Sequence, residues 1–178
     1  MDLEVTSESI QFLDKLSEDT EFIMKDEQFK KLLQYPRHHY TNTYDHSVRV
    51  AVGAALIAQK IGADPVSAAR VGLLHDMCFV NYYERSEHPG FYCFYHPVEA
   101  ADNADKRFGL TEIEKEAIRA HMFPLAIRIP TSKVALCLTL SDKAVAIYEG
   151  LYGFRMARRA MLWLYLKKMF PAVVAIAG

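Results

Sequence analysis

Apolar residues recur along this chain at the three- and four-residue spacing of amphipathic helices, whereas no stretch alternates steadily between apolar and polar positions. Asp64 and Pro65 have the cap and first-turn chemistry of a helix start, and Gly62 has that of a helix end. Thr111 and Glu114 have the spacing of a capping box. The predicted helices cover residues 7–34 (two or three pieces, broken near residues 19–20), 43–61, 65–76, 96–108, 111–122, 132–148 and 154–169. The pattern predicts an all-α fold, a compact bundle of helices around one core.

Two parts of this pattern are interrupted. Residues 79–95 are aromatic and rich in turn formers, so we expect a loop there with at most one helical turn. Gly150 and Gly153 are expected to separate the last two helices, because glycine weakens a helix interior. A chain of 178 residues can bury a core without disulfides and fits one domain better than two. The expected organisation is a single domain, residues 1–178, with a helical core at about 35–150 and with the helices at 7–34 and 154–169 packed on it.

Composition and charge narrow the functional classes. The chain is 51% hydrophobic and 24% charged with a formal net charge of −1, so no nucleic-acid partner is expected. Its three cysteines form no CxxC pair, which argues against a disulfide framework and against a thiolate zinc site. The N-terminus is acidic and unlike a signal peptide, and no apolar run reaches the ~18 residues of a membrane span. We therefore expect a cytoplasmic protein without a membrane partner.

One carboxylate stands out on an apolar helix. Asp142 lies within the predicted helix at 132–148, on the face that also carries Ala135, Leu138 and Val145. A carboxylate on a buried face is costly unless it is paired or holds a cation. The alternative is a surface residue that pairs with Lys143. The sequence leaves both interpretations open at this point.

Four histidines and a second aspartate occupy comparable positions at helix ends. His75 and Asp76 follow a buried helix, and they can serve one site only because that helix ends there. His46 lies in the first turns of a long helix, while His96 and His121 stand at the start and the end of theirs. Each of these, taken alone, is more often a buried histidine or a cap than a ligand.

The combination favours a metal site. Imidazole and carboxylate without thiolate suit iron, manganese, zinc or another borderline metal at an open catalytic position. Two divalent cations against Asp76 and Asp142 leave a charge of about +2, which suits a hydroxide and an anionic substrate.

The order His46, His75-Asp76, His96, His121, Asp142 resembles the HD-domain superfamily of metal-dependent phosphohydrolases, specifically the branch in which two additional histidines hold a second metal. The stretches that carry the resemblance are residues 43–51, 72–76, 96–97 and 141–144, and residues 120–125 look like a small, largely uncharacterised bacterial subgroup. It covers about residues 35–150 and implies a helical bundle of the HD-domain type.

The resemblance also implies a ligand set and a reaction. His46, His75, Asp76 and Asp142 would hold one metal, and His96, His121 and a bridging Asp76 the other. The implied cofactors are two divalent ions, iron or manganese, with zinc, nickel, magnesium and cobalt as alternatives. The implied reaction is cleavage of a phosphomonoester or phosphodiester, such as a nucleotide, by a metal-bound hydroxide. Hydrolysis of cyclic dinucleotides is not expected, because Met77-Cys78-Phe79 replaces the glycine and lysine of those relatives and no Gly-Tyr-Pro is present.

Two other functional classes stay open. Some relatives use the same ligands as a mixed-valence di-iron pair that oxidises C–H bonds, so the ligands do not separate a hydrolase from an oxygenase. The third class is a non-catalytic regulator that binds a metal or a nucleotide.

Several residues near the expected ligands are candidates for the substrate. Lys143 could meet a phosphate, and Arg49 could clamp an oxyanion from one helical turn after His46; a surface ion pair is the alternative for each. His38, His39, His88 and the aromatic residues of 79–95 are expected to be surface or loop residues. The basic and apolar helix at 154–169 is expected to pack on the bundle or on a second copy in a homodimer, rather than on a membrane surface. The expected partner is a small, phosphorylated anion.

Overall fold

The computed structural model describes residues 4–37, 40–79 and 91–169, and the side chains through residue 161 except residue 160. His38, His39, Tyr82, Tyr83 and His88, on which we made predictions, lie outside the described residues. The elements are α1 Ser7–Leu16, α2 Glu18–Lys25, α3 Glu27–Lys30, the 3₁₀ helix η1 Lys31–Gln34, β1 Pro36–Arg37, β2 Thr41–Asn42, α4 Thr43–Ile61, α5 Pro65–Leu74, α6 Tyr92–Phe108, α7 Glu112–Ala120 and α8 Lys133–Met169. The predicted all-α fold is confirmed, with one short antiparallel ladder between β1 and β2.

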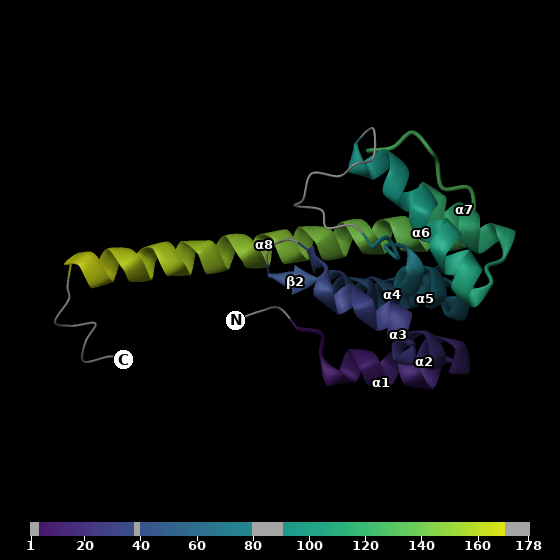
Figure 1. The fold of residues 1–178 in the computed structure, drawn as a ribbon, viewed down its shortest axis with the longest axis horizontal. Helices are drawn as coiled ribbons and strands as arrows, with labels where there is room; N and C mark the ends of the chain where they lie inside the picture. The colour runs from purple at the N-terminus through teal and green to yellow at the C-terminus, as the bar shows by residue number, and fades with distance from the viewer. Residues whose placement is uncertain (1–3, 38–39, 80–90, 170–178) are drawn as a thin grey trace.

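The helices form layers around α4 (Figure 1). α4 and α5 lie between α1–α3 on one side and the first half of α8 on the other, while α6 and α7 cover the end where α8 begins. Leu13, Ile23, Phe29, Leu73 and Leu138 are all fully buried, so helices from every layer contribute to one core. This core fixes the positions of the helix ends at which the residues of the candidate site lie.

Two glycines let the central helices approach closely. A Cβ on Gly72 of α5 would lie 2.5 Å from the Cα of Ala51 in α4. A Cβ on Gly53 of α4 would lie 2.3 Å from the Oγ of Ser141 in α8, which donates a hydrogen bond to the Val50 carbonyl at 2.8 Å. The absence of these two side chains therefore sets the spacing of α4, α5 and α8.

The predicted helix ends agree with the observed caps in most places. Gly62 ends α4 with φ of 65°, and the Asp64 side chain caps α5 ahead of Pro65. Thr111 and Glu114 form the predicted capping box. The break predicted near residues 19–20 is misplaced. α1 and α2 are separated at Ser17, whose side chain caps α2 by accepting from the Thr20 amide at 3.1 Å.

Two predicted boundaries are wrong. α6 begins at Tyr92 and not at His96, because the Tyr92 ring stacks on the His96 ring at 4.2 Å and its carbonyl accepts from His96, which together hold an extra first turn. α8 is one helix of 37 residues. Gly150 and Gly153 do not break it, because each costs only about 1 kcal/mol and no proline interrupts the hydrogen-bond ladder.

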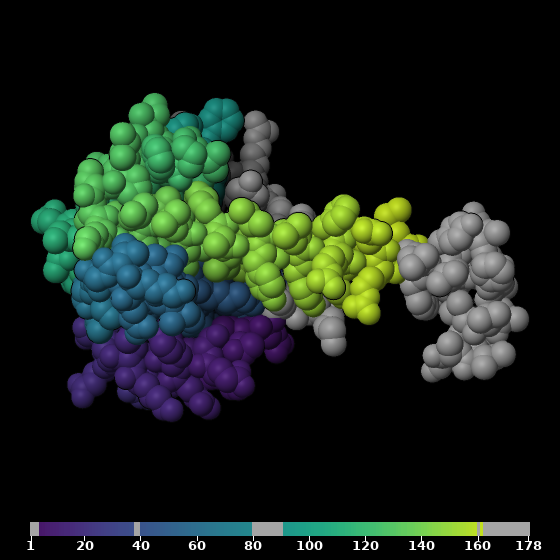
Figure 2. Space-filling view, turned by 180° about the vertical axis from the view of Figure 1, so that it is seen from behind, coloured from purple at the N-terminus to yellow at the C-terminus, as the bar shows by residue number. Residues whose placement is uncertain are grey.

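The last turns of α8 are not packed on the bundle as expected. They project beyond the other helices (Figure 1), and the part of α8 coloured in Figure 2 already extends away from the bundle; Leu151, Phe154 and Met161 are exposed. Within the described residues, no helix is both long enough and apolar enough to cross a membrane.

Candidate metal centre

The structure brings all six predicted ligands together in the core. His46 lies in the first turn of α4, and His75 and Asp76 follow α5. His96 lies in α6, His121 follows α7, and Asp142 lies in α8. The six residues are between 0% and 3% exposed, a degree of burial that ionised carboxylates tolerate only with cationic partners.

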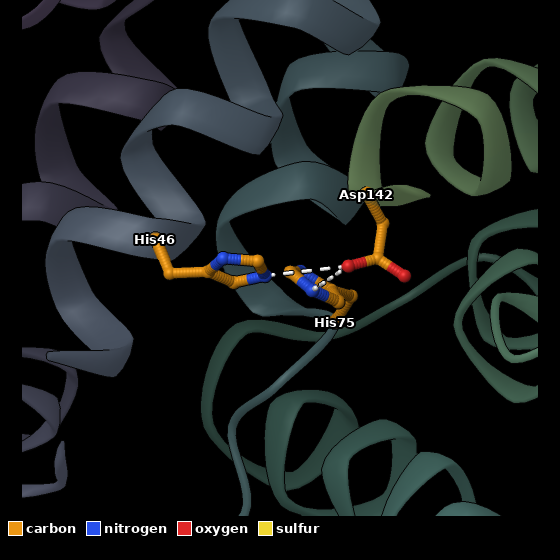
Figure 3. Close-up of side chains that lie close together, drawn as sticks. All are labelled: His46, His75 and Asp142. Carbon is orange, nitrogen blue, oxygen red and sulfur yellow. Dashed lines mark hydrogen bonds and ion pairs between the residues drawn. The ribbon is translucent and has the colours of Figure 1, made fainter. Parts of the chain in front are cut away.

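The first half of the site is formed by His46, His75 and Asp142, whose side chains point toward one another (Figure 3). Oδ1 of Asp142 lies 3.3 Å from Nε2 of His46 and 3.7 Å from Nε2 of His75. Oδ2 of Asp76 approaches the same two nitrogens, at 3.7 Å and 3.1 Å respectively. Two nitrogens and two carboxylate oxygens therefore face one position.

The second half uses the other oxygen of Asp76. Its Oδ1 lies 3.4 Å from Nε2 of His96 and 3.8 Å from Nε2 of His121, and these two nitrogens are 3.1 Å apart. His75, Asp76 and His121 also form a group that could hold an ion. The Asp76 carboxylate thus lies between two sets of histidines, with one oxygen toward each.

The histidines are oriented to present lone pairs to this centre. Nδ1 of His75, His96 and His121 each donates to a backbone carbonyl, at 2.8, 2.7 and 2.7 Å, and Nδ1 of His46 donates to the Glu149 carboxylate at 2.9 Å. In a neutral imidazole the other nitrogen, Nε2, is then an acceptor. The four acceptor nitrogens converge on two carboxylates, an arrangement that is stable only with a cation or a proton between them.

The residues fit divalent metal ions. Nε2 of His75 and both oxygens of Asp76 are buried and form no hydrogen bond among the described residues, although Oδ2 of Asp76 is ion-paired with Arg37 of β1. Two ligand atoms that each lie about 2.1 Å from one ion are roughly 3.0–3.4 Å apart, close to the observed separations. The donor set of nitrogen and oxygen without sulfur suits iron, manganese or zinc.

The electrostatics of these side chains also favour bound cations. Burial alone would raise the pKa of Asp76, but Arg37 and His75 outweigh it and hold this pKa well below its ordinary value. Burial would lower the pKa of His75, whereas Asp76 and Asp142 raise it to about 9. The pKa of His121 lies well below its ordinary value, because it is buried beside His75 and His96. A proton on His75 thus supplies part of the positive charge that metal ions would bring.

Two contributors were missed in the sequence. Arg37 of β1 places Nη2 2.7 Å from Oδ2 of Asp76, with its side chain 14% exposed. Glu149 of α8 is 1% exposed and accepts from His46 and from Nη1 of Arg49, the latter at 2.7 Å. Arg49 also donates to the Thr41 hydroxyl at 3.1 Å. Arg49 therefore lies behind His46 against Glu149 and does not line the cavity described next, so its predicted contact with substrate stays untested.

A cavity of about 460 Å³ opens onto the site. Its lining includes His96 and Asp142 of the candidate site, together with Lys143, Arg37 and Tyr92. Nζ of Lys143 lies 2.6 Å from Oδ2 of Asp142 and 3.1 Å from the His121 carbonyl. The lining also includes the apolar residues Phe91, Met122, Leu125 and Ala146. A small molecule that enters this cavity would meet both the candidate metal positions and the cation predicted at Lys143.

Comparison with known proteins places the fold and the site in one family. The model of the HD domain matches residues 43–147, which contain all six clustered residues. The chain belongs to the HD-domain family. HD domains bind divalent metals and are generally metal-dependent phosphohydrolases, so the resemblance noted in the sequence is confirmed at this level.

Individual relatives of this HD domain are distant. Ribonuclease Y of Clostridium kluyveri is 33% identical over 138 residues, which cover 77% of this chain and 23% of that protein. Ribonuclease Y of Clostridium botulinum and that of Clostridium tetani are each 31% identical over 137 residues. The chain thus spans about a quarter of the length of these relatives. No solved structure matches the chain.

Proposed function

We propose that this HD domain is a phosphohydrolase that holds two divalent ions, iron or manganese, and cleaves a small phosphate ester. The observation that carries the proposal is the Asp76 carboxylate, whose Oδ2 faces His46 and His75 and whose Oδ1 faces His96 and His121. A carboxylate shared in this way supports two ions a few ångströms apart. When bound, such a metal pair lowers the pKa of a water and polarises the phosphoryl group.

The chain's own residues would supply the rest of the site. Asp76 and Asp142 provide the negative charge that holds the cations, and the backbone carbonyls and Glu149 fix the four imidazoles. The buried position of the six side chains excludes bulk water, which strengthens each electrostatic contact. No nucleophilic side chain is needed for this chemistry.

A mixed-valence di-iron oxygenase could use the same six residues. The cavity supports hydrolysis over oxidation, because it contains two cationic side chains, Arg37 and Lys143, that suit an anionic substrate. Oxygen consumption by the iron-loaded protein, with an EPR signal from a half-reduced pair, would favour the oxygenase instead.

Cleavage of RNA is a second candidate, because the relatives found are called Ribonuclease Y. The chain spans only a quarter of their length, and its net charge of −1 offers no broad attraction for a polyanion. We therefore propose a small, phosphorylated substrate, and an RNA oligomer belongs in the assay as the competing substrate.

The test is phosphate release by protein purified without oxygen and loaded with iron or manganese. A panel of nucleotides, simple phosphate esters and an RNA oligomer would be compared for wild type, Asp76→Asn and the control Lys133→Gln. The Lys133 ammonium donates to the Ile61 and Gly62 carbonyls at the end of α4. We expect release by wild type and the control, and a loss of at least about 100-fold in Asp76→Asn. Absence of release from the whole panel by protein carrying two ions would contradict the proposal.

A further inference from the structure

Two cationic side chains in the cavity lining contact the carboxylates of the candidate metal site. Arg37 contacts Oδ2 of Asp76 at 2.7 Å, and Lys143 contacts Oδ2 of Asp142 at 2.6 Å. Both side chains line the same cavity, Arg37 from the β1 strand and Lys143 from α8. They therefore lie on segments far apart in the sequence and approach the site from different elements.

The present partners of these cations are the carboxylates that metal ions would engage. A carboxylate that neutralises a divalent ion attracts a neighbouring ammonium or guanidinium less strongly. Two divalent ions would also turn the balanced pairs Arg37–Asp76 and Lys143–Asp142 into an excess of positive charge. An anion in the cavity would then become the better partner of both side chains.

The geometry of Arg37 suits a phosphoryl group. Its guanidinium has five N–H donors in a planar fork, of which Nη2 approaches Asp76. It also interacts with the side chain of Tyr92, whose ring stacks on His96. Since Arg37 is paired across the ladder with Thr41, its backbone is fixed while the head of its side chain reaches the cavity.

We propose that Arg37 and Lys143 form a clamp for the terminal oxygens of a phosphomonoester dianion, so that this domain prefers monoesters to diesters. The inference rests on the proposed phosphohydrolase function and names its substrate class. A monoester dianion offers three terminal oxygens and two negative charges to the ions and to the clamp, whereas a diester offers two oxygens and one charge. The apolar lining residues Phe91, Met122, Leu125 and Ala146 would contact the remainder of the substrate.

Binding of inorganic phosphate, measured by isothermal titration calorimetry on protein loaded with two ions, tests the clamp without turnover. We expect Arg37→Gln and Lys143→Gln to bind phosphate about 10- to 100-fold more weakly than wild type, because each loses a charge-assisted contact. Arg37→Lys keeps the charge but loses the planar fork of donors, so its phosphate affinity should lie between that of wild type and that of Arg37→Gln. Arg107→Gln, which removes an arginine–carboxylate pair outside the cavity, is the matched control and should bind as wild type does.

The ester preference provides the second readout. For wild type, kcat/KM should be higher for 4-nitrophenyl phosphate than for bis(4-nitrophenyl) phosphate, and Arg37→Gln should reduce this ratio at least tenfold. Metal content and circular dichroism of each variant check that the ions and the fold are retained.

Different results overturn the two ideas separately. Equal phosphate affinity in wild type and Arg37→Gln, or no phosphate binding by fully loaded wild type, would refute the clamp even if esters are hydrolysed. Loss of bound metal in both Arg37→Gln and Arg37→Lys would also refute it, because Arg37 would then serve to position Asp76. Phosphate binding that depends on Arg37 without hydrolysis of any ester would keep the clamp and refute the hydrolase.

Discussion

Glu149 offers a sharp test of how the ligands are held. Its carboxylate accepts the Nδ1–H of His46 at 2.9 Å and a hydrogen bond from Arg49 at 2.7 Å, and it is 1% exposed. A charged acceptor behind a ligating imidazole raises the basicity of the ring and fixes its orientation. We therefore expect Glu149→Gln to weaken metal binding at the His46 position about 10- to 100-fold, since partners of this kind have that effect.

The same change has a separate cost in stability. It removes the negative charge of the buried Glu149 carboxylate from beside Arg49, whose side chain is 13% exposed. Breaking a buried pair from one side costs about 3 kcal/mol, equivalent to a fall in Tm of roughly 6–12 °C for a domain of this size. The double variant Arg49→Gln/Glu149→Gln should regain most of this stability, because both charges are removed, but its metal affinity should stay low.

Metal affinity would be measured by competition with a chelator, and Tm by circular dichroism on metal-free protein. Glu112→Gln is the control, because Glu112 is 86% exposed and pairs only with Lys115 among the contacts seen. Unchanged metal affinity in Glu149→Gln, or affinity restored in the double variant, would refute the reasoning that the carboxylate acts through His46.

Three further predictions concern packing and protons. Gly72→Ala should destabilise the fold by about 1–3 kcal/mol, because its Cβ would lie 2.5 Å from the backbone of α4, whereas Gly150→Ala should stabilise it by about 0.5–1 kcal/mol in the same denaturant titrations. Because Asp76 and Asp142 outweigh burial and raise the pKa of His75 to about 9, metal binding should release a proton below pH 9, so affinity should fall as pH falls and level off above 9. Burial would raise the pKa of Asp26, but Arg107 and the α3 amides outweigh it and lower this pKa. The stability gained from the ionised Asp26 should be present above pH 3.8 and lost as the pH falls below that value. Asp26→Asn should remove this pH dependence of Tm in thermal melts.

Most of the candidate site could be predicted because it is built from helix ends. Polar residues at the end of an apolar helix need a reason, and His75 and Asp76 follow such a helix, whereas His121 follows the amphipathic helix α7. Asp142 was recognisable from its apolar face. The structure brings these residues together as expected, and their role as ligands stays a prediction for experiment.

The missed residues could not be found by periodicity. Arg37 lies in a two-residue strand, too short to show a pattern, and its partner Asp76 is distant in the sequence. Glu149 was hidden by the expected break at Gly150, although it lies seven residues after Asp142 and therefore on the same helical face. The continuity of α8 depends on the sum of its helix-forming residues, against which two glycines are a small cost.

The most direct test of the account is the metal content of protein purified without oxygen, measured by ICP-MS for wild type and His121→Ala. The account predicts about two ions per wild-type chain, because Asp76 presents one oxygen to each histidine set, and about one ion in the variant. No bound metal in wild type, even after loading with iron or manganese, would contradict the central claim.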